Sequence, residues 1–163
     1  MPPVASASWA RDRVMKTFAR PECKAEILQR LRTIGPDTPA RWGRMSAHQM
    51  VCHLADACRM ASGEKVVTPV AGRLPRVVIK WIALYLPLPW PRGIPTRPEL
   101  DQLCGGTRPG DFVADLARAE MLLDSLTTQA SWSPHPIFGT MSRRDWMRWA
   151  YVHTAHHLRQ FGA

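Results

Sequence analysis

The sequence predicts an all-α protein, a four-helix bundle with one long crossover connection. Three observations lead to this class. Apolar residues recur at helical spacing in four segments, residues typical of helix caps and breakers bound these segments, and no segment shows the alternation of a strand. The chain has 163 residues, 45% of them hydrophobic, which suffices for one domain with a core. We expect that domain over residues 21–163, after an N-terminal extension over residues 1–20.

The first two helices have clear sequence boundaries. The first is expected over residues 21–34, where Pro21 suits a first turn and the stretch "GPDTPARWG" breaks the apolar pattern. The second is expected over residues 46–62, between the capping residue Ser46 and Gly63. Both boundaries follow from local backbone chemistry.

The other two helices are expected over residues 110–129 and 142–161. Asp111 lies near the start of the third, and Ser142 can cap the last. Between the second and third helices, residues 64–109 are rich in proline and glycine, with one short helix expected over residues 74–86. A connection of this length fits the crossover of a four-helix bundle.

The formal charge of +9 raises nucleic acid, an anionic membrane surface or acidic substrates as partners. Arginines are scattered along the whole chain, and no nucleic-acid motif with interleaved aromatic residues occurs, which argues against nucleic acid. The longest apolar stretch, "VVIKWIALYLPLPW", contains a lysine and two prolines and is shorter than the roughly 20 residues of a membrane span. No membrane anchor is expected.

The four cysteines form no C-x-x-C pair, and the N-terminus lacks the apolar region of a signal peptide. We therefore expect a cytoplasmic protein with reduced thiols.

The last helix carries three histidines that differ in direction. At about 100° per residue, His153 and His157 share the inward face with Trp146 and Trp149, and His156 lies at its border. In the second helix the same count places His53 and Asp56 inward. His48 lies roughly 140° from that face.

Three inward imidazoles from two helices can bind one divalent metal ion and leave coordination positions open. A single inward histidine is more often a hydrogen-bonded core residue. Three together require several partners in an apolar interior, and one cation satisfies all three. The pattern therefore predicts a Zn²⁺ or Ni²⁺ site formed by His53, His153 and His157, with ligand nitrogens about 3 to 4 Å apart.

Neighbouring polar residues are candidates for supporting roles. Asp56, one turn beyond His53, can orient an imidazole or act as a general base, although a helix-surface or capping role is equally compatible. Gln160 and His156 are candidates to contact the ligand histidines without binding the metal ion themselves. His48 and Cys52 are also four residues apart, but both lie off the inward face, so no second metal site is expected.

Three stretches carry a resemblance to a known family: "RWGRMSAHQMVCHLADACRMASGE", "PWPRGIPTRPE" and "HPIFGTMSRRDWMRWAYVHTAHHLRQFG". From about residue 21 to the end, the chain resembles the DinB-like superfamily, in a branch of uncharacterised proteins. The resemblance implies a DinB/YfiT-like bundle. It also implies a histidine triad from the second helix and an H-x-x-x-H pair of the last, matching His53, His153 and His157. Some relatives have histidine where Gln160 stands, which leaves an alternative frame that uses His156 and Gln160. The helical phase favours His153 and His157.

Two classes of function follow. The first is a metal-dependent enzyme that activates water or a thiol. The resemblance implies a thiol-dependent transferase or isomerase, or a hydrolase, acting on a small-molecule substrate such as a low-molecular-weight thiol. The second is a non-catalytic helical bundle in which the polar cluster is structural and the connection over residues 64–109 serves as a binding or homodimerisation surface.

Overall fold

A computed structural model describes residues 15–72 and 74–163, all of whose regular elements are helices. The elements are α1 (Pro21–Leu31), α2 (Ala47–Ser62), α3 (Arg76–Tyr85), the short 3₁₀ helix η1 (Pro98–Leu100), α4 (Phe112–Ser125), the 3₁₀ helix η2 (Leu126–Thr128) and α5 (Arg143–Gln160). The all-α class is confirmed. Most of the N-terminal extension expected over residues 1–20 lies outside the described residues.

Capping side chains fix the starts of the two helices that carry the site. The side chains of Ser46 and Ser142 each accept a hydrogen bond from the backbone N–H three residues later. In turn, the side chains of Gln49 and Asp145 accept hydrogen bonds from the backbone N–H groups of the two serines. Gly63 ends α2 in the left-handed conformation, with φ of 85°. These predicted boundaries are confirmed.

Two helices are shorter than predicted, because the backbone tightens at their C-terminal ends. After Leu31, the N–H groups of Thr33 and Ile34 bond to carbonyls three residues back, so α1 does not continue to residue 34. Helix α4 begins at Phe112, capped by Asp111, and passes into η2 after Ser125.

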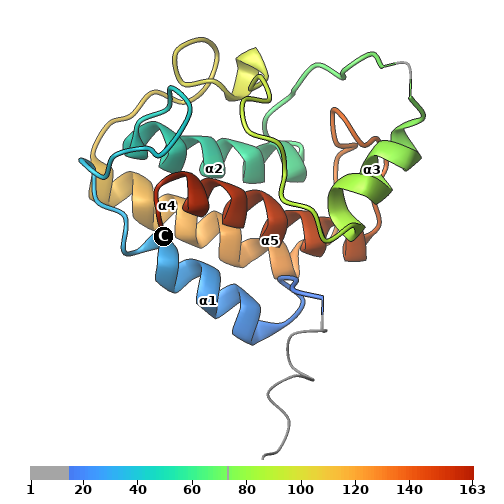
Figure 1. Cartoon of the computed structure of the whole chain (residues 1–163), viewed down its shortest axis with the longest axis horizontal. Helices are drawn as coiled ribbons and strands as arrows, with labels where there is room; N and C mark the ends of the chain where they lie inside the picture. The colour runs from blue at the N-terminus through green and yellow to red at the C-terminus, as the bar shows by residue number, and fades with distance from the viewer. Residues whose placement is uncertain (1–14, 73) are drawn as a thin grey trace, which may run out of the picture.

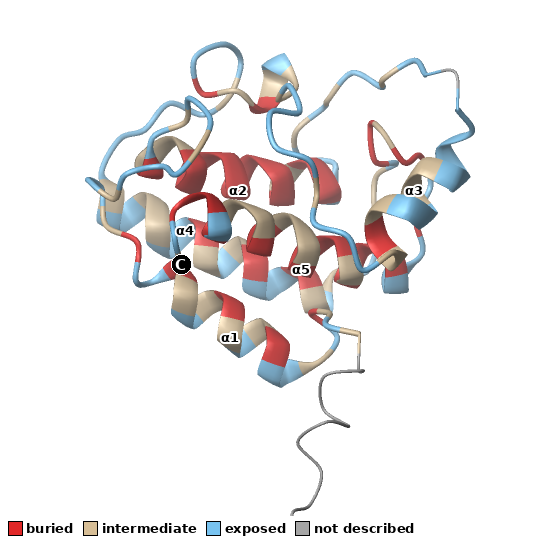
Figure 2. Cartoon of the chain, viewed as in Figure 1, coloured by how far each residue is buried: buried red, intermediate tan, exposed pale blue. Residues whose placement is uncertain are grey.

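Helices α1, α2, α4 and α5 lie side by side (Figure 1), with α2 packed on α4 and α1 on α5. Twelve of the sixteen residues of α2 are buried, so its ribbon is mostly red in Figure 2. The largest fully buried side chains include Trp146, Ile27, Met50, Leu54 and Leu158. A polar residue on the inner faces of α2 or α5 therefore needs a partner within the protein.

The connection between α2 and α4 covers one edge of these helices. Helix α3 packs against α5 through the buried Leu84 and leaves Val77 and Trp81 exposed. The chain then returns to α2, so that η1 lies against it. No helix of the described residues is long and apolar enough to span a membrane.

Candidate metal centre

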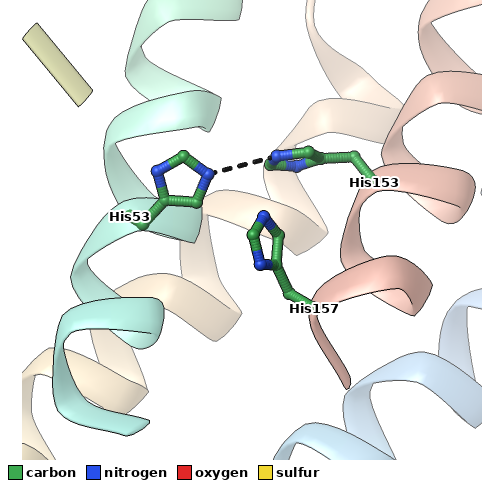
Figure 3. A group of neighbouring side chains, drawn as sticks. All are labelled: His53, His153 and His157. Carbon is green, nitrogen blue, oxygen red and sulfur yellow. Dashed lines mark hydrogen bonds between the residues drawn. The ribbon is translucent and has the colours of Figure 1, made fainter. Parts of the chain in front are cut away.

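The three predicted histidines meet between α2 and α5. His53 extends from α2, and His153 and His157 extend from successive turns of α5 (Figure 3). The Nε2 atoms of His53 and His153 are 3.2 Å apart, and the candidate ligand atoms of all three histidines lie within 4.8 Å of one another. Two nitrogens bound tetrahedrally at about 2.0 to 2.1 Å from one metal ion would be roughly 3.3 Å apart. The cluster therefore has the donor set and spacing to hold a metal ion.

A backbone carbonyl fixes the tautomer of His53. The Nδ1 atom of His53 lies 3.0 Å from the carbonyl oxygen of Leu100, at the end of η1. A carbonyl only accepts hydrogen bonds, so Nδ1 carries the proton and donates it. The lone pair of the neutral ring is then on Nε2, which faces the other two histidines.

Gln160 fixes the tautomer of His157. The Nε2 atom of Gln160 donates to the carbonyl oxygen of Trp42 at 2.9 Å, which sets the orientation of the Gln160 amide. Its Oε1 therefore faces His157 Nδ1 at 3.0 Å and accepts a hydrogen bond from it. The lone pair of His157 is left on Nε2, so Gln160 contacts and orients a candidate ligand.

Gly43 allows the loop after α1 to approach this amide. Its φ is 83°, and a Cβ atom there would lie 2.7 Å from Gln160 Nε2. Only glycine combines that conformation with that approach.

Aromatic rings hold His153. Its imidazole stacks on Trp149 with ring centroids 4.8 Å apart and an interplanar angle of 10°, and the centroid of the Trp90 ring lies 6.0 Å away. Within the part of the chain that the structure describes, His153 forms no side-chain hydrogen bond other than that with His53. Ring packing and the hydrogen bond with His53 therefore set its orientation.

The surroundings keep the three imidazoles neutral. Burial lowers the pKa of His53, and burial together with the neighbouring histidines holds the pKa values of His153 and His157 well below the ordinary value. A neutral ring is the form that binds a metal ion.

Asp56 is placed differently from the role expected for it. It is fully buried, and its oxygens accept hydrogen bonds of 2.7 Å from both the backbone N–H and the hydroxyl of Thr107. Arg59 at 3.1 Å and Lys65 at 3.2 Å pair with the same carboxylate. Among the residues that the structure describes, none of its hydrogen bonds goes to a histidine. We therefore correct the interpretation of Asp56 as a catalytic base or imidazole partner: it fastens the connection to α2, and the Leu100 carbonyl orients His53 instead.

His156 lies outside the set of three. Its ring contacts Trp42 and Trp90, each with centroids 6.0 Å away, and meets the ring of His157 edge-on at 5.3 Å. His156 also lines an open surface groove, together with Trp42 and Trp90, and is therefore a neighbour of a candidate ligand.

A second cluster of potential metal ligands joins α2 to α4, at His48 and Cys52, where no second metal site was expected. Asp115 Oδ2 lies 2.8 Å from His48 Nε2 and 3.7 Å from Cys52 Sγ, and it also accepts from the backbone N–H of Gly110 at 2.9 Å. His48 and Cys52 do lie off the inner face, but that side of α2 is covered by α4, which supplies the carboxylate. No local pattern predicts this pairing, because Asp115 is 67 residues from His48.

We expect Cys52 to be unreactive at neutral pH. Burial and the Asp115 carboxylate raise the pKa of Cys52 to about 12, and burial raises that of Cys58 to about 12, whereas Cys104 is exposed. Iodoacetamide at pH 8 should label Cys104 in the native protein while Cys52 and Cys58 stay unmodified, as measured by peptide mass mapping. The unfolded protein should be labelled at every cysteine. Labelling of native Cys52 as fast as Cys104 would contradict this prediction.

The fold and the site define an all-helical protein with a buried three-histidine cluster between two of its helices. The chain belongs to the family described as "Protein of unknown function (DUF1569)", whose family profile matches residues 17–163. No curated protein and no solved structure matches the chain.

Proposed function

We propose that this protein binds one divalent metal ion, Zn²⁺ or Ni²⁺, through the Nε2 atoms of His53, His153 and His157. We propose further that it acts as a metal-dependent transferase or hydrolase on a small molecule, with a low-molecular-weight thiol as the candidate co-substrate. The observation that carries the proposal is the fixed tautomer of two of the rings. Because the Leu100 carbonyl and Gln160 accept from the Nδ1 atoms, both Nε2 lone pairs are directed into the cluster.

Three protein ligands favour a catalytic site over a closed structural one, because a fourth position stays open. An ion with such an open position lowers the pKa of a water or thiol and supplies a nucleophile at neutral pH. The chain's own residues hold the protons on Nδ1 of His53 and His157 and pack the rings of Trp149 and Trp90 against His153. Zn²⁺ and Ni²⁺ both accept imidazole nitrogen.

We also propose that the four packed helices form a four-helix bundle of the DinB-like kind. The support is the order of α1, α2, α4 and α5, the long connection between α2 and α4, and the position of the histidines on α2 and α5. An experimental structure of the protein with an unrelated helical topology would contradict this proposal.

Metal content tests the site. The purified protein, stripped with a chelator and dialysed against Zn²⁺ or Ni²⁺, should hold one ion per chain by elemental analysis. His153→Ala should lose it, because two imidazoles remain, whereas His156→Ala should keep it. Equal metal content in wild type and His153→Ala would refute the site.

An open coordination position on the bound metal ion would distinguish a metal-dependent enzyme from a non-catalytic bundle. Co²⁺ loaded in place of the native ion reports its ligands through its visible absorption, and addition of a small thiol should change that spectrum if a position is accessible. An unchanged spectrum would favour the structural role. A positive result justifies screening for thiol transfer and ester hydrolysis.

A further inference from the structure

An open groove of about 620 Å³ lies beside the histidine cluster, a size that suits a small-molecule ligand. It is bounded by the loop after α1, by the connection after α3 and by the last turns of α5. The residues that line it are Arg41, Trp42, Pro89, Trp90, Pro91, Arg92, His156 and Arg159. Three segments far apart in the sequence thus form one surface.

The walls of the groove are tied to the helices. Trp90 Nε1 donates to the carbonyl oxygen of Ala83 in α3 at 2.7 Å. On the opposite wall, the Arg41 N–H donates to the Gln160 carbonyl at 2.7 Å, and the Trp42 carbonyl accepts from the Gln160 side chain. Because Gln160 also contacts His157, the groove and the candidate metal centre share a supporting residue.

The groove carries positive charge without a balancing carboxylate. Three arginines and no acidic residue line it, and none of the ion pairs formed among the described residues involves Arg41, Arg92 or Arg159. Arg92 is stacked over the Trp42 ring, with Cζ 4.4 Å from its centroid.

One end of the groove reaches the histidines. The Trp90 ring lies 6.0 Å from those of both His153 and His156. His156, which lines the groove, is in turn 5.3 Å from His157. A molecule held by the arginines would therefore extend toward the candidate ligands.

We infer that the groove binds an anionic small molecule, a carboxylate or phosphate with an apolar body, as the substrate of the candidate metal centre. The arginines bind the anion, Trp42 and Trp90 pack against the body, and the uncharged end points toward the three histidines. The role as substrate depends on the proposed function, whereas binding of the anion depends on the groove alone.

Calorimetry with three probes tests the inference on metal-free and Zn²⁺-loaded protein. Phenyl phosphate and 3-phenylpropionate should both bind, and the uncharged 3-phenylpropanamide should bind at least about tenfold more weakly, because charge-assisted hydrogen bonds to arginine are lost. Affinity for the anions should fall as salt increases. Phenyl phosphate binding stronger than that of 3-phenylpropionate would assign the anion as a phosphate, and the reverse order as a carboxylate.

Arginine variants locate the binding. Arg92→Gln and Arg159→Gln should each weaken phenyl phosphate binding by about tenfold. Arg118→Gln, which removes an exposed arginine of α4 that does not line the groove, should not. Three outcomes would each overturn the inference. They are equal affinity for the charged and uncharged probes, no binding of any probe, and binding that requires Zn²⁺ and is unchanged in the arginine variants.

Metal content of the same samples keeps the two proposals separate. The arginine variants should retain the bound Zn²⁺, since the hydrogen bonds of the three histidines within the described residues involve no arginine. Anion binding without Zn²⁺ binding would leave the groove assignment intact and refute the metal centre. Zn²⁺ binding without discrimination between the probes would do the opposite.

Discussion

Replacement of Asp56 by alanine is expected to lower the free energy of unfolding by about 3 kcal/mol, the lower end of the range for breaking a buried ion pair. The carboxylate is 0% exposed and pairs with Arg59 and Lys65 while accepting two hydrogen bonds from Thr107. The two cations keep 16% and 21% of their side-chain surface exposed, so they can partly return to water, which limits the loss. Thermal melting should show a decrease of about 6 to 12 °C.

Control variants distinguish this anchoring role from catalysis. Asp37→Ala, at an exposed position, should change stability by less than about 0.5 kcal/mol. Asp56→Asn, which keeps the shape and loses the charge, should lie between alanine and wild type. Folded Asp56→Ala should still bind metal, because no hydrogen bond joins Asp56 to a histidine. A variant with wild-type stability and no metal binding would contradict the anchoring role.

The stabilisation by Asp56 should depend on pH. Burial raises the pKa of this carboxyl group, but the hydrogen bonds from Thr107 and the charge of Lys65 lower it by more, so the folded-state pKa is below the ordinary value. The unfolded chain therefore binds a proton first as the pH falls. The difference between wild type and Asp56→Ala should be full above the unfolded pKa, near 3.9, and should shrink as the pH falls through the folded pKa.

Metal binding is expected to stabilise the wild-type protein by about 2.7 kcal/mol at a metal concentration one hundred times Kd, because the unfolded chain does not hold the three imidazoles together. For a chain of this size, the melting temperature should rise by about 5 to 11 °C. A chelator should reverse the rise. The measurement is thermal melting with and without Zn²⁺ or Ni²⁺.

For each variant, the melting temperature with metal is compared with that of the same variant without metal. A loss of stability from the substitution itself therefore cancels. His53→Ala should lose most of the shift. His156→Ala should keep it, because His156 faces the groove, and so should His48→Ala, because His48 pairs with Asp115 on the other side of α2. If His53→Ala responded to metal as strongly as the wild type, the three-histidine site would be wrong.

The sequence alone determined the helical class, the capping residues and the inward direction of the three histidines. Each depends on interactions within a few residues. Ser46 and Ser142 cap through bonds to the third residue beyond them, and the spacing of His153 and His157 places both on one face through the helical period alone. The helix ends after Leu31 and Ser125 were less predictable, because tightening of the last turn depends on packing.

Only the tertiary structure decided which groups surround the histidines. His53 is oriented by a backbone carbonyl 47 residues away, Asp56 is bound to Thr107 across 51 residues, and Gln160 reaches Trp42 across 118. A carbonyl carries no side-chain signature, and the path of the connection is set by packing against α2 and α5 rather than by local preference. For the same reason the sequence suggests Asp56 as a partner of the histidines, whereas in the fold its hydrogen bonds with Thr107 and its ion pair with Lys65 hold the connection in place.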